Sequence, residues 1–300
     1  MNILEFLFSL VTVVFSRVFN SESGSKNDRY LLNNFHVNFV KNSNSLAGSA
    51  VKTVIGTPFT HLNRVNSTNI YAMEQLQAKL AEHGAVFFAD LQTDGKGQMG
   101  KKWESKAGQN LLMSILLNVS ALNIGDQFAL SAAIALAARD LLSNYIPSNL
   151  TIKWPNDIYW GDRKAGGILI ENQISGGIWT NAVAGIGINI NQTQFEGVQN
   201  KAVSLKQITG KSYPPIDLAK ELCEKVEKRF KQLLETNGSD IILSEYNKVL
   251  YKKGQPVKLK NGAISAVHII NEVTKKGDLI ATSGIQHQFQ HGTIEWIIEG

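Results

Sequence analysis

The spacing of apolar residues divides the chain into helices and strands that do not alternate strictly. From residue 56 onward, apolar positions three and four residues apart predict helices, and shorter apolar or alternating runs predict strands. We expect helices at residues 70–82, 128–142, 217–235 and 238–252. We expect strands at residues 85–91, 111–119, 151–154, 165–171 and 179–190, with a hairpin at residues 175–177 joining the last two. Because strands mostly follow strands, the pattern favours an α+β fold over a regular βαβ fold.

The last 50 residues have a different sequence pattern, with short apolar runs separated by turns. After Lys253, short apolar runs are separated by Asn261-Gly262 and by Lys276-Gly277-Asp278, which are both turn sequences. Regularly spaced short strands are typical of a small β-barrel. We therefore predict a core domain at residues 53–250 and a small β-barrel domain at residues 251–300.

The first 52 residues fit neither domain. Residues 2–19 are an apolar run broken by Glu5 and Arg17, and residues 20–50 are rich in Asn and Ser. A signal peptide carries positive charge before its apolar stretch, whereas Glu5 is negative, and the run is marginal in length for a membrane span. We predict an N-terminal extension at residues 1–52 outside the folded core. A membrane anchor is the alternative.

Composition narrows the class of protein. Of 300 residues, 43% are hydrophobic and 18% are charged, which predicts a folded chain with a buried core. The net charge of +5 favours anionic partners such as nucleotides or an acidic protein, but is too small to indicate nucleic acid alone. The single cysteine, Cys223, excludes an intrachain disulfide, and its helical context predicts a buried apolar role. A reducing cytoplasmic location fits this cysteine content.

A glycine-rich loop at residues 95–103 (GKGQMGKKW) lies between two predicted strands. Its glycines match the dinucleotide-binding pattern G-x-G-x-x-G, but no helix follows and no carboxylate stands about 20 residues later. It also fails the P-loop pattern, because Lys102 replaces the hydroxyl residue that binds magnesium. What remains is a loop whose backbone N–H groups and lysines suit an anionic ligand.

Three further segments make this loop informative. They are residues 153–157 (KWPND), 164–171 (KAGGILIE) and 185–191 (GIGININ). Together with Ser67-Thr68-Asn69 and the loop, they resemble biotin–protein ligases in order and spacing, from about residue 57 to the C-terminus. The resemblance implies a mixed-sheet core like that of class II aminoacyl-tRNA synthetases and an SH3-like C-terminal barrel. No winged helix-turn-helix is evident, which implies the monofunctional type without a nucleic-acid partner.

The resemblance also implies the chemistry. Biotin and ATP with Mg²⁺ would form biotinyl-5′-AMP, and a lysine of a biotin carboxyl carrier domain would then accept the biotin. No tightly bound prosthetic group is implied. Such chemistry depends on stabilising charge near the phosphate, and a fixed lysine ammonium suits that task.

Site residues follow from the matched motifs. Lys164 would be catalytic, between the biotin carboxylate and the α-phosphate. Biotin binding is expected of Ser67, Thr68, Asn69, Gln92, Lys96, Gly97, Gln98, Gly166 and Gly167. Binding of ATP or the adenylate is expected of Gly95, Lys96, Gly100, Lys101, Trp103, Asn156, Asp157 and Asn189, with a phosphate-bound Mg²⁺ near Asp157.

Structural interpretations stand beside these roles. Residues 67–69 also suit the cap of a helix, and Gly166-Gly167 also suits close packing of strands. Lys164 alone would be an ordinary surface lysine at a turn. His287 and His291 fall on a run that alternates like a strand, so we expect exposed strand residues and no metal site.

One departure concerns the loop. Many members of the family carry three arginines where this chain has Lys96, Gln98 and Lys101. Because lysine cannot make the bidentate phosphate contact of arginine, we expect faster escape of the adenylate. The alternatives are a lipoate–protein ligase of the same fold, a non-catalytic biotin- or nucleotide-sensing module, and a membrane-tethered ligase. A homodimer is a further expectation from the resemblance.

Overall fold

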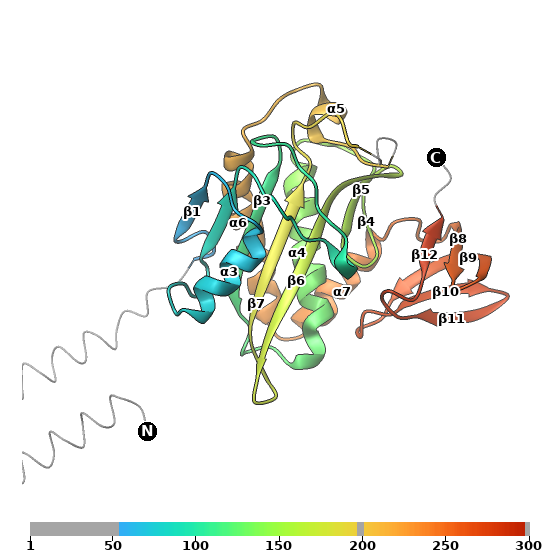
Figure 1. The fold of residues 1–300 in the computed structure, drawn as a ribbon. Coiled ribbons are helices and arrows are strands. Elements are labelled where there is room, and N and C mark those ends of the chain that lie inside the picture. Colours follow the sequence, from blue (N-terminus) through green and yellow to red (C-terminus); the bar gives the residue numbers. More distant parts are fainter. Residues whose placement is uncertain (1–53, 197–200, 298–300) are drawn as a thin grey trace, which may run out of the picture. The chain divides into compact units, whose positions relative to one another are not determined.

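The computed structural model describes residues 54–196 and 201–297, so the predicted N-terminal extension lies outside the described residues. Seven strands form one sheet with the order β1-β2-β3-β7-β6-β5-β4 (Figure 1). Only β1 and β2 pair in parallel within it, and the other neighbours are antiparallel. The strands are β1 (Phe59–Leu62), β2 (Val86–Ala89), β3 (Leu111–Asn118), β4 (Leu150–Lys153), β5 (Asp157–Trp160), β6 (Arg163–Ser175) and β7 (Ile178–Ile188).

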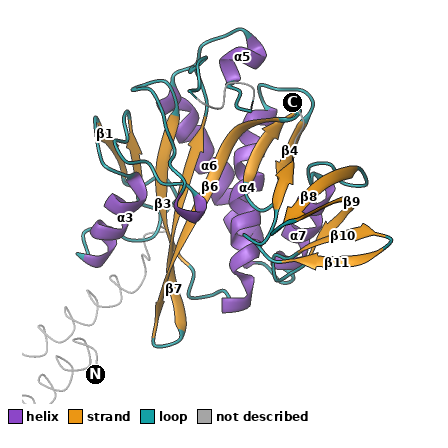
Figure 2. Ribbon diagram, turned by 45° about the vertical axis from the view of Figure 1, so that its right-hand side comes forward, coloured by secondary structure: helices purple, strands orange, loops and turns teal. Residues whose placement is uncertain are grey.

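Helices cover both faces of this sheet (Figures 1 and 2). The helices α4 (Gln127–Ser143), α6 (Pro215–Leu234) and α7 (Gly238–Lys248) pack together, and α4 and α6 contact the sheet on one face. The helix α3 (Thr68–Gln77) packs against β2, β3 and β7 on the other face. A short helix, α5 (Leu205–Thr209), follows β7 and begins with a capping box at Ser204 and Gln207.

Alternation along the strands supplies an apolar core to each face. In β2, Val86 and Phe88 join the large core under α4, whereas Phe87 joins a smaller core beneath α3. In α4, alanines at consecutive turns are buried, which lets the helix approach the sheet closely. The predicted mixed α+β fold is therefore confirmed.

A second sheet follows α7, with the order β11-β10-β9-β8-β12. Its neighbouring strands are all antiparallel, and no pairing closes β11 onto β12 among the described residues. Residues 53–300 group as one compact unit, and Trp154 Nε1 donates to Gly277 O at 2.9 Å between the two sheets. The division at residue 250 stays a prediction. The strands are β8 (Pro256–Asn261), β9 (Ile264–Val273), β10 (Leu279–Ser283), β11 (Ile285–Phe289) and β12 (Glu295–Ile297).

Several predicted elements need correction. The helix expected at residues 70–82 starts at Thr68 and ends at Gln77, because Lys79 takes a left-handed backbone (φ 58°) that a helix cannot continue through. The helix expected to reach residue 252 ends at Lys248. The strands β1 and β5 and the helix α5 were not predicted. The hairpin is confirmed, since Gly176 and Gly177 connect β6 to β7 with positive φ angles.

Candidate functional site

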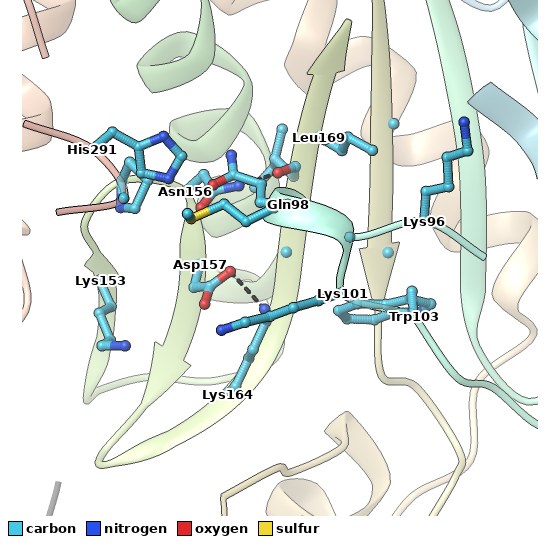
Figure 3. Close-up of a pocket in the computed structure, with 18 of the residues that line it drawn as sticks. Lys96, Gln98, Lys101, Trp103, Lys153, Asn156, Asp157, Lys164, Leu169 and His291 are labelled. Carbon is cyan, nitrogen blue, oxygen red and sulfur yellow. Dashed lines mark hydrogen bonds and ion pairs between the residues drawn. The ribbon is translucent and has the colours of Figure 1, made fainter. Parts of the chain in front are cut away.

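A cavity of about 760 Å³ opens on the α3 side of the large sheet. Its volume lies in the range of small-molecule sites. It is lined by the start of α3, the glycine-rich loop, strands β5 to β7 and residues 291–296, which lead into β12. Figure 3 shows lining residues from the loop, from β5 and β6, and His291.

The register of the central strands explains why the cavity exists. Gly187 of β7 pairs with Gly167 of β6, and Gly167 pairs with Asp157 of β5, so two glycines adjoin across the sheet beside Asp157. A Cβ on Gly187 would lie 2.6 Å from Cε2 of Trp103, and a Cβ on Gly185 would lie 2.1 Å from Oδ1 of Asn69. Glycine is therefore required at both positions, because side chains from other segments occupy the space.

Lys164 and Asp157 form an ion pair at the base of the cavity. Lys164 Nζ lies 2.7 Å from Asp157 Oδ1, as the dashed line in Figure 3 marks. A Cβ on Gly167 would lie 3.1 Å from Lys164 Nζ, so the glycine leaves room for the pair. The pairing of β5 with β6 contains an irregularity: Ile158 pairs with Gly166, but the next residue, Tyr159, pairs with Lys164, so one residue of β6 is skipped.

The backbone of Lys164 is anchored by the segment after β7. Lys164 N donates to Lys201 O at 2.8 Å, and Val203 N donates to Lys164 O at 2.9 Å. The Asn189 amide nitrogen donates to Lys164 O at 3.3 Å and to Val203 O at 3.2 Å. The Asn189 amide nitrogen thus holds the backbone at Lys164, and Asn189 is not among the residues that line the cavity, so its contact with ATP stays a prediction.

The glycine-rich loop folds as a small hairpin over the cavity. Gly97 N donates to Lys101 O at 2.7 Å, and Trp103 N donates to Gly95 O at 2.8 Å. Its tip has positive φ at Met99 (55°) and Gly100 (74°), as a tight hairpin turn requires. Gly95 and Gly100 do not line the cavity, and they shape the loop instead. A Cβ on Gly95 would lie 2.4 Å from Trp103 O.

One end of the cavity is polar and buried. The Thr68 backbone N–H donates to Gln92 Oε1 at 2.8 Å, and the Thr68 hydroxyl lies 3.0 Å from the same oxygen. Ser67, Thr68 and Asn69 are each at most 3% exposed. Ser67 takes the position before the first residue of α3, but its side chain makes no capping hydrogen bond. The Thr68 hydroxyl therefore contacts Gln92, and the expected capping of α3 by the Ser67 side chain is not observed.

The other end is cationic. Lys101, Lys153 and Lys164 all line it, and Lys153 Nζ lies over the rings of Tyr159 (5.3 Å) and Trp296 (5.5 Å). Burial, with a smaller contribution from the charges of Lys164 and Lys101, lowers the pKa of Lys153 to about 8 against the opposing effects of Asp157 and Glu295. An anion bound at this end would relieve the repulsion among the lysines.

Most predicted site residues come together around the cavity. Gly166 does not line the cavity. A Cβ added to Gly166 would lie only 2.9 Å from Gly187 O, so glycine here allows the two strands to pack closely, as the structural interpretation expected. Asn156 is buried and its amide nitrogen donates to Ile168 O. The lining includes Ser67, Thr68, Asn69, Gln92, Lys96, Gly97, Gln98, Lys101, Trp103, Asn156, Asp157, Lys164 and Gly167.

The sequence did not predict Lys153 or His291 as lining residues. His291 follows β11, which ends at Phe289, so its expected place on a strand is wrong. Its ring meets Trp154 edge-on at 5.9 Å, and partial burial lowers its pKa. His287 does lie on β11, beside His268 and Phe289. In the described part of the chain, no group of three or more His, Cys, Asp or Glu residues is arranged to hold a metal ion.

Cys223 lies away from the cavity. Cys223 is buried in α6, its thiol donates to Ala219 O at 3.2 Å, and burial raises its pKa to about 12, so the predicted structural role is confirmed. None of the helices in residues 54–196 and 201–297 combines the length and apolar character needed to cross a membrane.

Comparison with known proteins agrees with this geometry. The model of the Biotin/lipoate A/B protein ligase family matches residues 61–189. The chain is 30% identical to the bifunctional ligase/repressor BirA of Escherichia coli and of Salmonella typhimurium, over 72% of this chain and about two thirds of theirs (66% and 67%). It is 28% identical to the biotin–acetyl-CoA-carboxylase ligase of Paracoccus denitrificans, over 73% of this chain and 92% of that protein.

Among solved structures, the fold is similar to the biotin protein ligase from Aquifex aeolicus in complex with biotin and ATP. The TM-score is 0.68 at 26% identity, and the match covers 80% of this chain and 99% of that one. The matched family region contains the start of α3, the glycine-rich loop and the Lys164–Asp157 pair, which line much of the cavity. The chain belongs to the biotin protein ligase family.

Proposed function

We propose that the protein activates biotin with ATP, forming biotinyl-5′-AMP, and transfers the biotin to a lysine of a biotin carboxyl carrier domain. The observation that carries this proposal is the Lys164 ammonium, held 2.7 Å from Asp157 at the cationic end of a cavity whose other end is polar. The names of the relatives in Paracoccus denitrificans and Aquifex aeolicus support biotin and ATP as substrates.

Biotin would bind at the polar end. Ser67, Thr68, Asn69 and Gln92 offer hydroxyl and amide groups to its ureido ring, with Gly167 beneath the ligand. The carboxylate of biotin would then reach Lys164. Lys96, Gly97 and Gln98 would close over the ligand from the loop.

ATP would bind with its phosphates at the cationic end. Lys101 and Lys153 would attract the phosphates, and Trp103 would pack against the adenylate. Mg²⁺ would arrive with the phosphates, because Asp157 and Glu295 are too few to hold it alone and Asp157 already pairs with Lys164. Asn189 would act through its hold on the Lys164 backbone.

Both chemical steps depend on charge. In the first, a biotin carboxylate oxygen attacks the α-phosphorus and pyrophosphate leaves. In the second, the neutral amine of the carrier lysine attacks the biotinyl carbonyl, AMP leaves with the bonding electrons, and the amine nitrogen releases a proton to solvent as the amide forms. The Lys164 ammonium reduces the repulsion between carboxylate and phosphate and stabilises the negative charge that develops on the phosphoryl oxygens.

The proposal also covers the fold, the location, the partners and the domain bounds of the protein. The fold would be that of the class II aminoacyl-tRNA synthetases, with the second sheet as an SH3-like barrel. The enzyme would act in the cytoplasm, without a nucleic-acid partner and without a membrane, and would form a homodimer. The core domain would span residues 53–250 and the barrel residues 251–300, and residues 1–52 would take no part in catalysis.

The test is carrier labelling by purified protein, with and without residues 1–52, given MgATP, radiolabelled biotin and a biotin carboxyl carrier domain. Lys164→Ala is expected to abolish the label. Lys252→Ala is a matched control, since Lys252 pairs with Asp162 at 2.9 Å with similar side-chain exposure (31% against 32% for Lys164) but lies outside the cavity. Labelling of a carrier with lipoate in place of biotin would contradict biotin as the substrate. Binding of biotin or ATP without transfer to the carrier would indicate a sensing module.

A further inference from the structure

A buried network of side-chain oxygens behind the polar end of the cavity is one hydrogen short. Ser114 Oγ, on β3, lies 2.6 Å from Asn69 Oδ1 and 2.8 Å from Thr68 Oγ1. Thr68 Oγ1 in turn lies 3.0 Å from Gln92 Oε1. Ser114 is 0% exposed and does not line the cavity, so it acts only through Thr68 and Asn69.

The shortage follows from the inventory of donors. Amide oxygens only accept, and each hydroxyl carries a single hydrogen. The Gln92 oxygen is identified by the Thr68 backbone N–H, which donates to it at 2.8 Å. The hydroxyls of Ser114 and Thr68 therefore supply two hydrogens to three oxygen–oxygen contacts. Whichever way they turn, one pair of oxygens has no hydrogen between them.

Glu171 sets the direction of this network. The Asn69 amide nitrogen donates to Glu171 Oε2 at 2.8 Å and to Leu169 O at 3.3 Å. Turning the amide over would place its oxygen against a carboxylate and a carbonyl, so the oxygen stays toward Ser114. Glu171 lies on β6 outside the cavity lining, and its reach to the ligand passes through Asn69.

We propose that Glu171 and Ser114 are positioning residues that hold the polar end as an acceptor, so that the site selects ligands with an N–H donor. The inference rests on the proposed function, in which a ureido N–H of biotin is that donor. A ligand N–H that donates to Thr68 Oγ1 or Asn69 Oδ1 gives one of these acceptor oxygens a hydrogen that the two hydroxyls cannot provide. The dithiolane ring of lipoate carries no N–H, so it leaves the network unsatisfied, and unpaired buried polar groups are a strong source of discrimination.

The first measurement is the Kd of biotin, by calorimetry without ATP. Glu171→Ala is expected to weaken binding about tenfold, because the Asn69 amide loses a charged partner. Glu171→Gln keeps an acceptor and is expected to restore most of the affinity. Ser114→Ala is expected to weaken binding similarly. Glu272→Ala, on exposed β9, is the control, and melting temperatures verify that each variant folds.

The second measurement uses biotin methylated on a ureido nitrogen. We expect the wild type to bind this analogue about 100-fold more weakly than biotin, and Glu171→Ala to narrow the difference to about tenfold, while the KM for ATP stays unchanged. An undiminished preference for biotin in both Glu171→Ala and Ser114→Ala would overturn the positioning role. Failure of the wild type to bind biotin would instead overturn the proposed function, and this inference with it.

Discussion

The Lys164 ammonium and the Asp157 carboxylate meet above the bare backbone of Gly167, whose missing side chain leaves the space that the pair occupies. The two residues come from neighbouring strands, β6 and β5, so the sheet sets their separation. A charge held in this way needs little reorganisation when a phosphate arrives.

Asp157→Asn removes the partner that holds the Lys164 ammonium in place. We expect adenylation to slow by about 10² to 10³, the range seen when one preorganised charge or donor is removed. Biotin affinity measured without ATP is expected to stay within about twofold, because the polar end is built from other residues. Pyrophosphate release reports the adenylation rate. Asp162→Asn, which breaks the ion pair with Lys252 outside the cavity, should leave that rate unchanged.

Gly187→Ala tests the contact with Trp103. The added methyl would lie 2.6 Å from Cε2 and 2.8 Å from Cζ2 of the ring, so the ring must move. We expect the KM for ATP to rise about tenfold or more, with biotin affinity nearly unchanged. Gly125→Ala is the control, because no atom lies within 4 Å of its added methyl. An unaltered KM for ATP would show that the position of Trp103 does not matter.

The pKa of Lys153 predicts a pH dependence. Burial lowers this pKa to about 8, so the lysine loses its charge as the pH rises from 7 to 9. Since the neutral form attracts phosphate poorly, we expect the KM for ATP to rise several-fold across that range. Lys153→Arg is expected to flatten the profile, because a guanidinium stays charged. A profile that is equally steep in wild type and Lys153→Arg would contradict this role.

The same group affects stability. The pKa of Lys153 is below its ordinary value of 10.5, so between about pH 8 and 10.5 the unfolded chain binds more protons than the folded chain. The contribution of this lysine to the free energy of unfolding therefore rises with pH across that window and is constant below it. Urea denaturation of wild type and Lys153→Met at pH 7.5 and 10 measures the difference, and Lys153→Met should lose the rise.

Gln98→Arg tests the loop chemistry. Gln98 lines the cavity beside the three lysines, and an arginine there can contact a phosphate with two N–H groups. We expect the biotinyl-adenylate to dissociate more slowly from this variant than from the wild type, by about tenfold. Gln286→Arg on the exposed part of β11 controls for the added charge. Equal off-rates for wild type and Gln98→Arg would show that residue 98 does not help to retain the biotinyl-adenylate.

Local patterns were sufficient to predict most of the central sheet. Long apolar or alternating runs such as Leu111–Asn118 and Ile178–Ile188 carry their own signal. The four-residue strand β5 was missed because it follows Pro155-Asn156, which suggest a turn, and β1 is a short edge strand. Its pairing with β2 depends on the folded core and cannot be seen in four residues.

The candidate site was only partly predictable for the same reason. Each motif can be read locally, and the resemblance to biotin–protein ligases that the motifs carry placed Lys164, Asp157 and residues 67–69 in one site. The lining by His291 depends on how the second sheet packs against Trp154, which no local pattern encodes. Ser114 did leave a signal, since it is one of two polar residues in the strand Leu111–Asn118 and the only one buried there.

The cavity lining runs from Ser67 to Trp296, so its parts are separated by most of the described chain. A site of this kind is dominated by long-range contacts, which form slowly because large loops must close first. In a partly folded chain whose second sheet has not yet packed against the central sheet, the cavity would lack the wall that residues 291–296 provide. We therefore expect the complete site to form late in folding, so a refolding experiment should recover ATP binding after secondary structure has returned.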